Sequence, residues 1–190
     1  MKVFIGYDPR EAEIFHVCVQ SILMNTKSLV QIIPLNLEQL KPIYKELHCD
    51  NSNSFIYSRF LVPYLCNFTG SAIYMDGDMV VRGDLSELSA LNNRKYAVNV
   101  VKHDYKTKQT IKYMNQVNED FPRKNWSSLM IWNCDHDKNK ILQPDLISKA
   151  TGKFLHRFEW LDDKEINELP KTWNWLCDEY GENNKAKLIH

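Results

Sequence analysis

Short apolar runs alternate with stretches of helical spacing in the first part of the chain. Residues 3–5 form an apolar run that ends at Gly6, which is typical of a buried strand. Asp8 then predicts the N-cap of a helix, and Pro9 fits the first helical position. Residues 29–35 form a second apolar strand after that helix. A strand, a helix and a strand in this order predict parallel strands joined by a right-handed crossover.

The rest of the chain continues the alternation of strands and helices. We expect further strands at residues 71–75, 96–101 and 129–132, and helices at residues 37–47, 57–65, 85–88, 145–150 and 162–168. Residues 102–125 are polar and basic and predict a long irregular segment, while residues 169–175 predict an aromatic loop. The sequence therefore predicts one α/β domain over residues 1–190, with a mostly parallel central sheet.

The overall charge narrows the range of partners. The 190 residues contain 24 lysines and arginines and 24 aspartates and glutamates, so the formal net charge is zero. Such a chain has no bulk attraction for nucleic acid or for an anionic membrane. We therefore expect no nucleic-acid partner, and an anionic ligand would need a local site.

The sequence also bears on the cellular compartment. No apolar run approaches the roughly 20 residues that span a bilayer, and the first residues do not have the pattern of a signal peptide. The five cysteines show no metal-binding spacing, which favours reduced thiols. We therefore expect a cytoplasmic protein with no transmembrane segment, in the host cytoplasm if the source is a virus.

Two aspartates follow the apolar run of residues 73–75. Asp76 and Asp78 are separated by Gly77, and ligand sites in open α/β sheets lie at the carboxyl ends of strands. Two carboxylates this close repel each other unless a cation joins them, and Mg2+ and Mn2+ accept oxygen ligands. Gly77 would let the backbone turn tightly. The pattern favours a divalent-metal site, and the alternative is an Asp-Gly turn between two strands.

Two further polar groups are candidates for binding. Tyr7 could stack on a planar base, and Asp8 could accept a hydrogen bond from an imide N–H or a ribose hydroxyl. An ordinary N-capped turn explains these two residues equally well. Asp162 and Asp163 follow Trp160 and precede the aromatic loop, and carboxylates beside flat rings suit a carbohydrate. A helix N-cap with core tryptophans is the alternative there.

The histidines differ in their surroundings. His190 follows the apolar pair Leu188-Ile189, which favours a short strand that holds it against the domain. The alternative is a frayed terminal histidine that plays no part in the site. We expect structural or surface positions for four histidines without ligand spacing, namely His16, His48, His136 and His156.

Taken together, these motifs resemble the glycosyltransferases of the GT-A fold, and specifically the family 8-like enzymes related to glycogenin and bacterial galactosyltransferases. Compact members of this kind also occur in phages and in large algal viruses, including chlorella viruses. The matching segments, in the order of the family's motifs, are residues 4–8, 57–63, 73–78, 125–133 and 161–167.

The resemblance implies a single GT-A (Rossmann-like) domain that acts as a metal-dependent glycosyltransferase. Such an enzyme would move a sugar, expected to be a hexose, from a UDP-sugar donor to a hydroxyl of a glycan or glycoprotein acceptor, with retention of the anomeric configuration. Two alternatives stay open, a sugar-nucleotide nucleotidyltransferase and a catalytically silent nucleotide- or sugar-binding module. The Gly-rich phosphate loop of the nucleotidyltransferases does not appear in residues 6–10.

The resemblance also implies a role for each matching residue. Mn2+ or Mg2+ would be bound by Asp76, Asp78 and His190. The donor- and nucleotide-binding set would be Tyr7, Asp8, Arg10, Arg59, Gly77 and Ser127, with Tyr7 and Asp8 holding the uracil. The catalytic set would be Asp162, Asp163 and Arg59, in which the two aspartates bind the donor hydroxyls and Arg59 lies near the donor sugar and the DxD motif.

The sequence departs from the family pattern in three places. Asp163 stands where many members have Gln, and Ser127-Ser128 where many have Ser-Gly or Ala-Gly. In the family, a Gly-containing stretch that closes on the phosphates follows the histidine, whereas this sequence ends at His190. We therefore leave the donor sugar open, and also whether residues 1–190 are the N-terminal domain of a longer protein.

Overall fold

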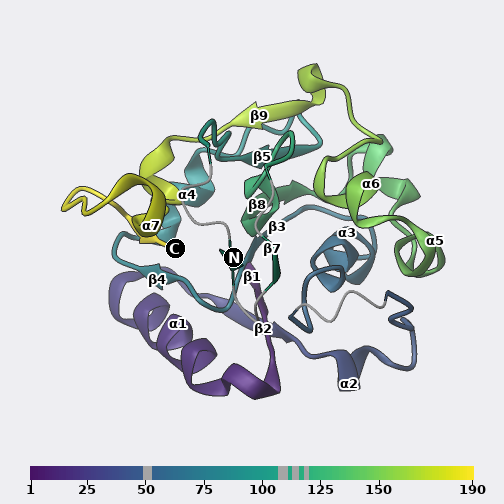
Figure 1. Cartoon of the computed structure of the whole chain (residues 1–190), viewed down its shortest axis with the longest axis horizontal. Coiled ribbons are helices and arrows are strands. Elements are labelled where there is room, and N and C mark those ends of the chain that lie inside the picture. The colour runs from purple at the N-terminus through teal and green to yellow at the C-terminus, as the bar shows by residue number, and fades with distance from the viewer. Residues whose placement is uncertain (49–52, 107–110, 113–115, 118–119) are drawn as a thin grey trace.

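The computed structural model describes residues 1–48, 53–106, 111–112, 116–117 and 120–190. Its centre is a six-stranded sheet with the order β2-β1-β3-β8-β5-β9 (Figure 1). The strands β2, β1 and β3 run parallel, β8 is antiparallel to both of its neighbours, and β9 is parallel to β5. The expected mostly parallel sheet is thus confirmed, with β8 as the reversed strand. The bounds are β1 Lys2–Gly6, β2 Gln31–Leu35, β3 Ser71–Met75, β5 Val98–Val100, β8 Leu129–Asn133 and β9 Ile166–Glu168.

Helices cover both faces of this sheet, which explains why its inner strands are apolar on both sides. Side chains alternate along β3, so Tyr74 belongs to one hydrophobic cluster and Ile73 and Met75 belong to the other. The helix α1 packs with the second cluster, whereas α3 and α5 pack with the first (Figure 1). The helices are α1 Ala12–Asn25, α2 Leu37–Leu40, α3 Val62–Leu65, α4 Leu85–Ala90, α5 Pro144–Lys149, α6 Gly152–His156 and α7 Cys177–Tyr180.

The expected helix at residues 162–168 is wrong. A 3-10 turn, Asp163–Glu165, is followed directly by the strand β9. Ile166 is buried and lies opposite Val98 of β5. The backbone hydrogen bonds that the sheet offers to this short segment therefore decide its conformation over its local sequence.

Three other expectations need smaller corrections. The expected helix at residues 57–65 is a 3-10 turn, Ser58–Leu61, followed by α3, with Pro63 in the first turn of that helix. The helix expected at residues 37–47 ends at Leu40. Inside the segment expected to be irregular, β6 (Ile111–Lys112) pairs with β7 (Gln116–Val117), while residues 107–110, 113–115 and 118–119 lie outside the described residues.

Four cysteines in the described residues are free, namely Cys18, Cys66, Cys134 and Cys177. Cys49 lies outside that part of the chain. Among the helices that the structure describes, none has both the length and the apolar character needed to cross a bilayer.

Candidate metal and nucleotide site

The DxD turn begins where the central strand β3 ends. The backbone N–H of Asp76 donates to the carbonyl of Ser128, the residue just before β8, and this hydrogen bond fixes the start of the turn. A Cβ atom added to Gly77 would lie 2.4 Å from the carbonyl oxygen of Gly6, which is closer than real Cβ contacts. Only glycine therefore lets this turn press against the end of β1. Asp78 follows and leads into the short strand β4, Val80–Val81.

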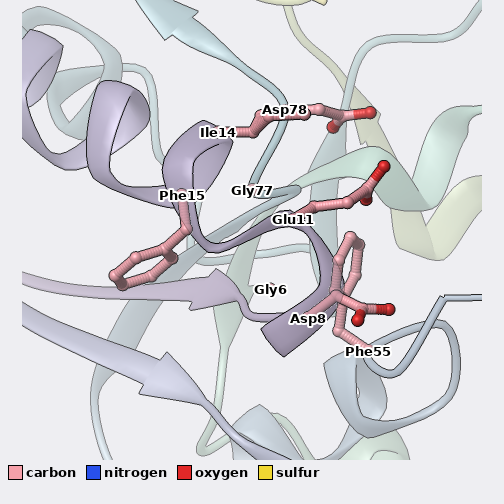
Figure 2. Close-up of a pocket in the computed structure, with 8 residues that line it drawn as sticks. All are labelled: Gly6, Asp8, Glu11, Ile14, Phe15, Phe55, Gly77 and Asp78. Carbon is pink, nitrogen blue, oxygen red and sulfur yellow. The ribbon is translucent and has the colours of Figure 1, made fainter.

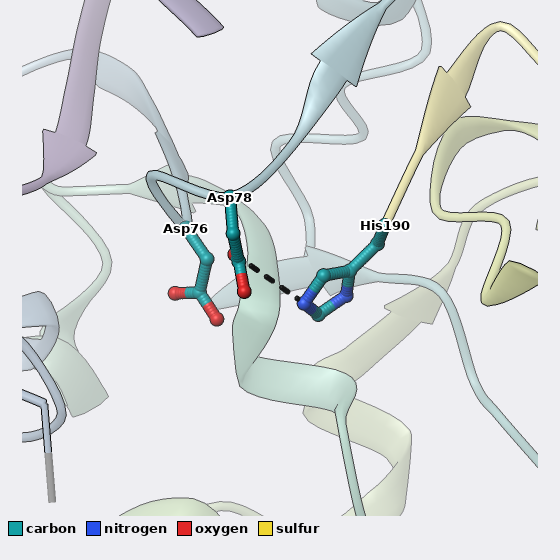
Figure 3. Close-up of side chains that lie close together, drawn as sticks. All are labelled: Asp76, Asp78 and His190. Carbon is teal, nitrogen blue, oxygen red and sulfur yellow. Dashed lines mark ion pairs between the residues drawn. The ribbon is translucent and has the colours of Figure 1, made fainter. Parts of the chain in front are cut away.

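A second strand brings His190 to the same turn. The strand β10, Leu188–Ile189, pairs antiparallel with β4, as the apolar pair before the histidine predicts. The backbone N–H of His190 also donates to the carbonyl of Trp175 over 2.9 Å. His190 Nε2 consequently lies 3.6 Å from Asp78 Oδ1, and Figure 3 shows the imidazole facing both carboxylates.

Asp76, Asp78 and His190 fit a divalent cation. One ligand atom from each residue lies within 4.8 Å of the other two, and carboxylate oxygens with one imidazole nitrogen are a ligand set for Mn2+ or Mg2+. Burial raises the pKa of Asp76, the charge of Arg59 opposes that rise, and the nearby charge of Asp78 adds to it. A cation at this point would offset the repulsion between the two carboxylates.

Arg59 lies behind the DxD turn, where the resemblance expects it. It is 4% exposed, and its Nη1 lies 3.0 Å from Asp76 Oδ1 and 3.0 Å from the carbonyl oxygen of Ser127. Its guanidinium carbon lies 5.2 Å from the ring centroid of Tyr74 and 5.7 Å from that of Phe55. Arg59 thus compensates the buried charge of Asp76 from inside the protein.

A small pocket joins the DxD turn to the turn after β1 (Figure 2). Phe55 stands on one side of it, beside Asp8, and the carboxylates of Glu11 and Asp78 point to the same side of the pocket in Figure 2. An acidic rim of this kind repels phosphate groups unless a cation is present. The pocket is lined by Gly6, Asp8, Glu11, Ile14, Phe15, Phe55, Gly77 and Asp78.

Asp8 is the N-cap of the turn Pro9–Glu11, which is the plainer of the two interpretations of this residue. The residue is 2% exposed, and its carboxylate accepts hydrogen bonds from the backbone N–H groups of Arg10 and Ser54 and from the Arg10 guanidinium. The hydrogen bonds from Arg10 hold the pKa of Asp8 well below its usual range. Arg10 and Asp8 are therefore engaged with each other, while half-buried Tyr7 packs edge-on against Phe15.

Ser127 is close to Arg59, whereas the other predicted aspartates are apart from the metal-ligand cluster. The Ser127 hydroxyl lies 2.9 Å from His156 Nδ1. The side chains of Asp162 and Asp163 are 69% and 81% exposed, and Asp163 pairs with Arg123. These two aspartates flank the start of a 3-10 turn, as the N-cap alternative describes.

Sequence reasoning missed several residues of the site. Tyr74, whose hydroxyl donates to Asp76 over 2.6 Å, could have been found from the strand period, since it is two residues before Asp76 on the same face. Phe55, Ser54 and His156 had no such signal, because their contacts with the site come from segments distant in the sequence.

Comparisons with known proteins agree with this α/β fold. Residues 12–138 match Glycosyl transferase family 8. The chain is also 42% identical over 178 residues to Protein CDI of Arabidopsis thaliana, covering 92% of this chain and 69% of the relative. The chain therefore belongs to Glycosyl transferase family 8.

Solved structures support the GT-A fold. The apo structure of the bifunctional glycosyltransferase WbbM matches with a TM-score of 0.68 and 16% identity, covering 100% of this chain and 45% of the other. The galactosyltransferase LgtC in complex with donor and acceptor sugar analogues matches with a TM-score of 0.57 and 12% identity, covering 100% of this chain and 86% of the other. This chain thus spans less than half of the WbbM chain.

Proposed function

We propose that this chain is a metal-dependent glycosyltransferase that moves a hexose from a UDP-sugar to a hydroxyl of a glycan or glycoprotein, with retention. The observation that carries this proposal is the convergence of Asp76, Asp78 and His190 within 4.8 Å at the end of β3. Family membership supports glycosyl transfer, and the captured donor and acceptor analogues of LgtC support the same two classes of ligand.

The residues of the site have separate proposed roles in binding the metal, compensating its buried ligand and binding the nucleoside. Asp76, Asp78 and His190 would hold Mn2+ or Mg2+, which when bound offsets the negative charge that develops on the leaving diphosphate. Arg59 opposes the protonation that burial favours at Asp76. The pocket between the turn at Asp8 and the DxD turn is the place we assign to the nucleoside, with Tyr7 beside it.

One part of the proposal depends on the resemblance alone. Asp162 and Asp163 are assigned to the donor hydroxyls, and their exposure leaves them accessible to a ligand. A cytoplasmic location is also our proposal, and the free thiols of the cysteines that the structure describes support it.

The decisive experiment removes the metal. Because the pocket rim is acidic, we expect UDP to bind tightly with Mn2+ and only weakly after EDTA has chelated it. Titration calorimetry measures both affinities, and equal affinity in the two conditions would refute the proposed metal site. Incubation with UDP-sugars and Mn2+ then measures release of UDP. Metal-dependent binding without any turnover would identify a silent nucleotide-binding module.

A further inference from the structure

We infer that Tyr74 is a positioning residue for the metal centre, an inference that rests on the proposed function. Its hydroxyl donates to Asp76 Oδ1 over 2.6 Å, a length typical of an O–H donor with an ionised acceptor. Tyr74 has no exposed surface, so its hydroxyl is not solvated by bulk water. The period of the strand fixes this pairing, because residues 74 and 76 fall on the same face.

The ring of Tyr74 also supports the guanidinium of Arg59. The guanidinium carbon lies 5.2 Å from the ring centroid, and Arg59 Nη1 lies 3.0 Å from the same oxygen of Asp76 that the phenol contacts. Tyr74, Arg59 and Asp76 therefore form a closed triangle in which each group contacts the other two. Arg59 is itself held by the carbonyl of Ser127, so the triangle is tied to the 3-10 turn Trp126–Ser128 that precedes β8.

This triangle makes the two aspartates of the DxD turn unequal. Asp76 is 7% exposed, its Oδ1 accepts a hydrogen bond from the Tyr74 hydroxyl, and its Oδ2 accepts one from Arg59 Nη1 over 3.3 Å. The side chain of Asp78 is 52% exposed and lies next to the imidazole of His190 at 3.6 Å. Asp76 is thus a carboxylate whose orientation the core sets in advance, and the phenol of Tyr74 holds one of its two oxygens. Outer partners of this kind hold a ligand in its binding geometry before the ion arrives.

A pair of single-atom deletions tests this role. Tyr74→Phe removes the hydroxyl and keeps the ring beneath Arg59. Tyr44→Phe is the matched control, because Tyr44 is also buried and donates to a carboxylate, Glu46 Oε2, at 2.8 Å. Calorimetric titration with Mn2+ alone, without nucleotide, measures metal affinity in the wild type and both variants. We expect Tyr74→Phe to weaken Mn2+ binding by about tenfold or more and Tyr44→Phe to leave it unchanged.

The outcomes separate this inference from the proposed function. A wild type that binds no Mn2+ would refute the metal site itself. A wild type that binds Mn2+ with the same affinity as Tyr74→Phe would leave the metal site standing and overturn the role of Tyr74. Thermal melting completes the test. Loss of a cooperative transition in Tyr74→Phe alone would also overturn the inference, because the phenol would then be a requirement of the fold rather than of the metal centre.

Discussion

Asp76 and Asp78 form one pair of neighbouring carboxylates, and Asp162 and Asp163 form another, yet the fold treats the two pairs differently. The first pair follows a strand in the middle of the sheet, and the pairing of β10 with β4 brings His190 to it. The second pair precedes the edge strand β9 and remains exposed beside lysine and arginine side chains.

The difference lies in the groups that the fold places around each pair. Gly77 presses the DxD turn against β1, Arg59 compensates Asp76 from the core, and β10 supplies the imidazole. Around Asp163 the nearest cation is Arg123, whose guanidinium also donates to the carbonyl of Phe158. The two pairs therefore differ in their position in the sheet as well as in the spacing of their carboxylates.

The largest effect is expected at Asp78. Asp78→Ala removes an exposed ligand that contributes little packing, so the fold should stay intact while the metal centre loses a carboxylate. Because a bound cation contributes several kcal/mol to catalysis, we expect turnover to fall about a thousandfold or more. A UDP-release assay and circular dichroism measure both properties. Asp137→Ala is the control, since Asp137 is exposed and pairs with Lys140. Wild-type turnover in Asp78→Ala would remove the distinction between the two acidic pairs.

A smaller effect is expected at His190. His190→Ala keeps the backbone hydrogen bond to Trp175 but removes the imidazole, so Mn2+ affinity should fall by at least about tenfold. Calorimetric titration with Mn2+ measures the affinity of the wild type and of the variant, with exposed His16→Ala as control. Equal Mn2+ affinity in His190→Ala and in the wild type would exclude His190 as a ligand.

A change in the exposed pair Asp162 and Asp163 should affect turnover without affecting the affinity for Mn2+. If Asp163 binds a donor hydroxyl, Asp163→Ala should lower kcat while leaving Mn2+ affinity unchanged. A hydrogen bond to a carboxylate contributes about 1.5 kcal/mol, which corresponds to about tenfold in rate. Steady-state kinetics and Mn2+ calorimetry test the two halves. Asp145→Ala is a matched control, because Asp145 is an exposed partner of Lys149. Unchanged kcat in Asp163→Ala would reduce this pair to a helix cap.

The sequence predicted the buried parts of this comparison better than the exposed parts. Apolar runs locate β1 and β3, and the apolar pair before His190 locates β10, because burial in a sheet requires such side chains at those positions. The segment at residues 166–168 is mostly polar, and its conformation depends on pairing with β5. The hydrogen bond from Ser54 to Asp8 is likewise a contact between segments that are distant in the sequence. No local pattern of residues therefore predicts it.

The smallest expected effect concerns Asp8, whose carboxylate is engaged within the chain. Removing an N-cap costs about 1 kcal/mol, so Asp8→Ala should lower the free energy of unfolding by about that amount near neutral pH. The hydrogen bonds from Arg10 lower the pKa of Asp8 in the folded state. As the pH falls, the unfolded chain therefore takes up this proton before the folded chain does. The stabilisation is complete above about pH 4, the ordinary value for Asp, and is lost progressively below it.

Urea unfolding of the wild type and Asp8→Ala at about pH 7 and about pH 3 measures this change. The difference between the two proteins should be smaller at the lower pH, because the wild type has by then lost part of the contribution of the ionised carboxylate. Asp84→Ala is the control, since Asp84 caps α4 by accepting from Ser86. It should lower stability without changing UDP affinity. If the difference in the free energy of unfolding between the wild type and Asp8→Ala is the same at both pH values, the charge of Asp8 does not stabilise the turn. The carboxylate would then be available to a ligand, as the resemblance to the family implies.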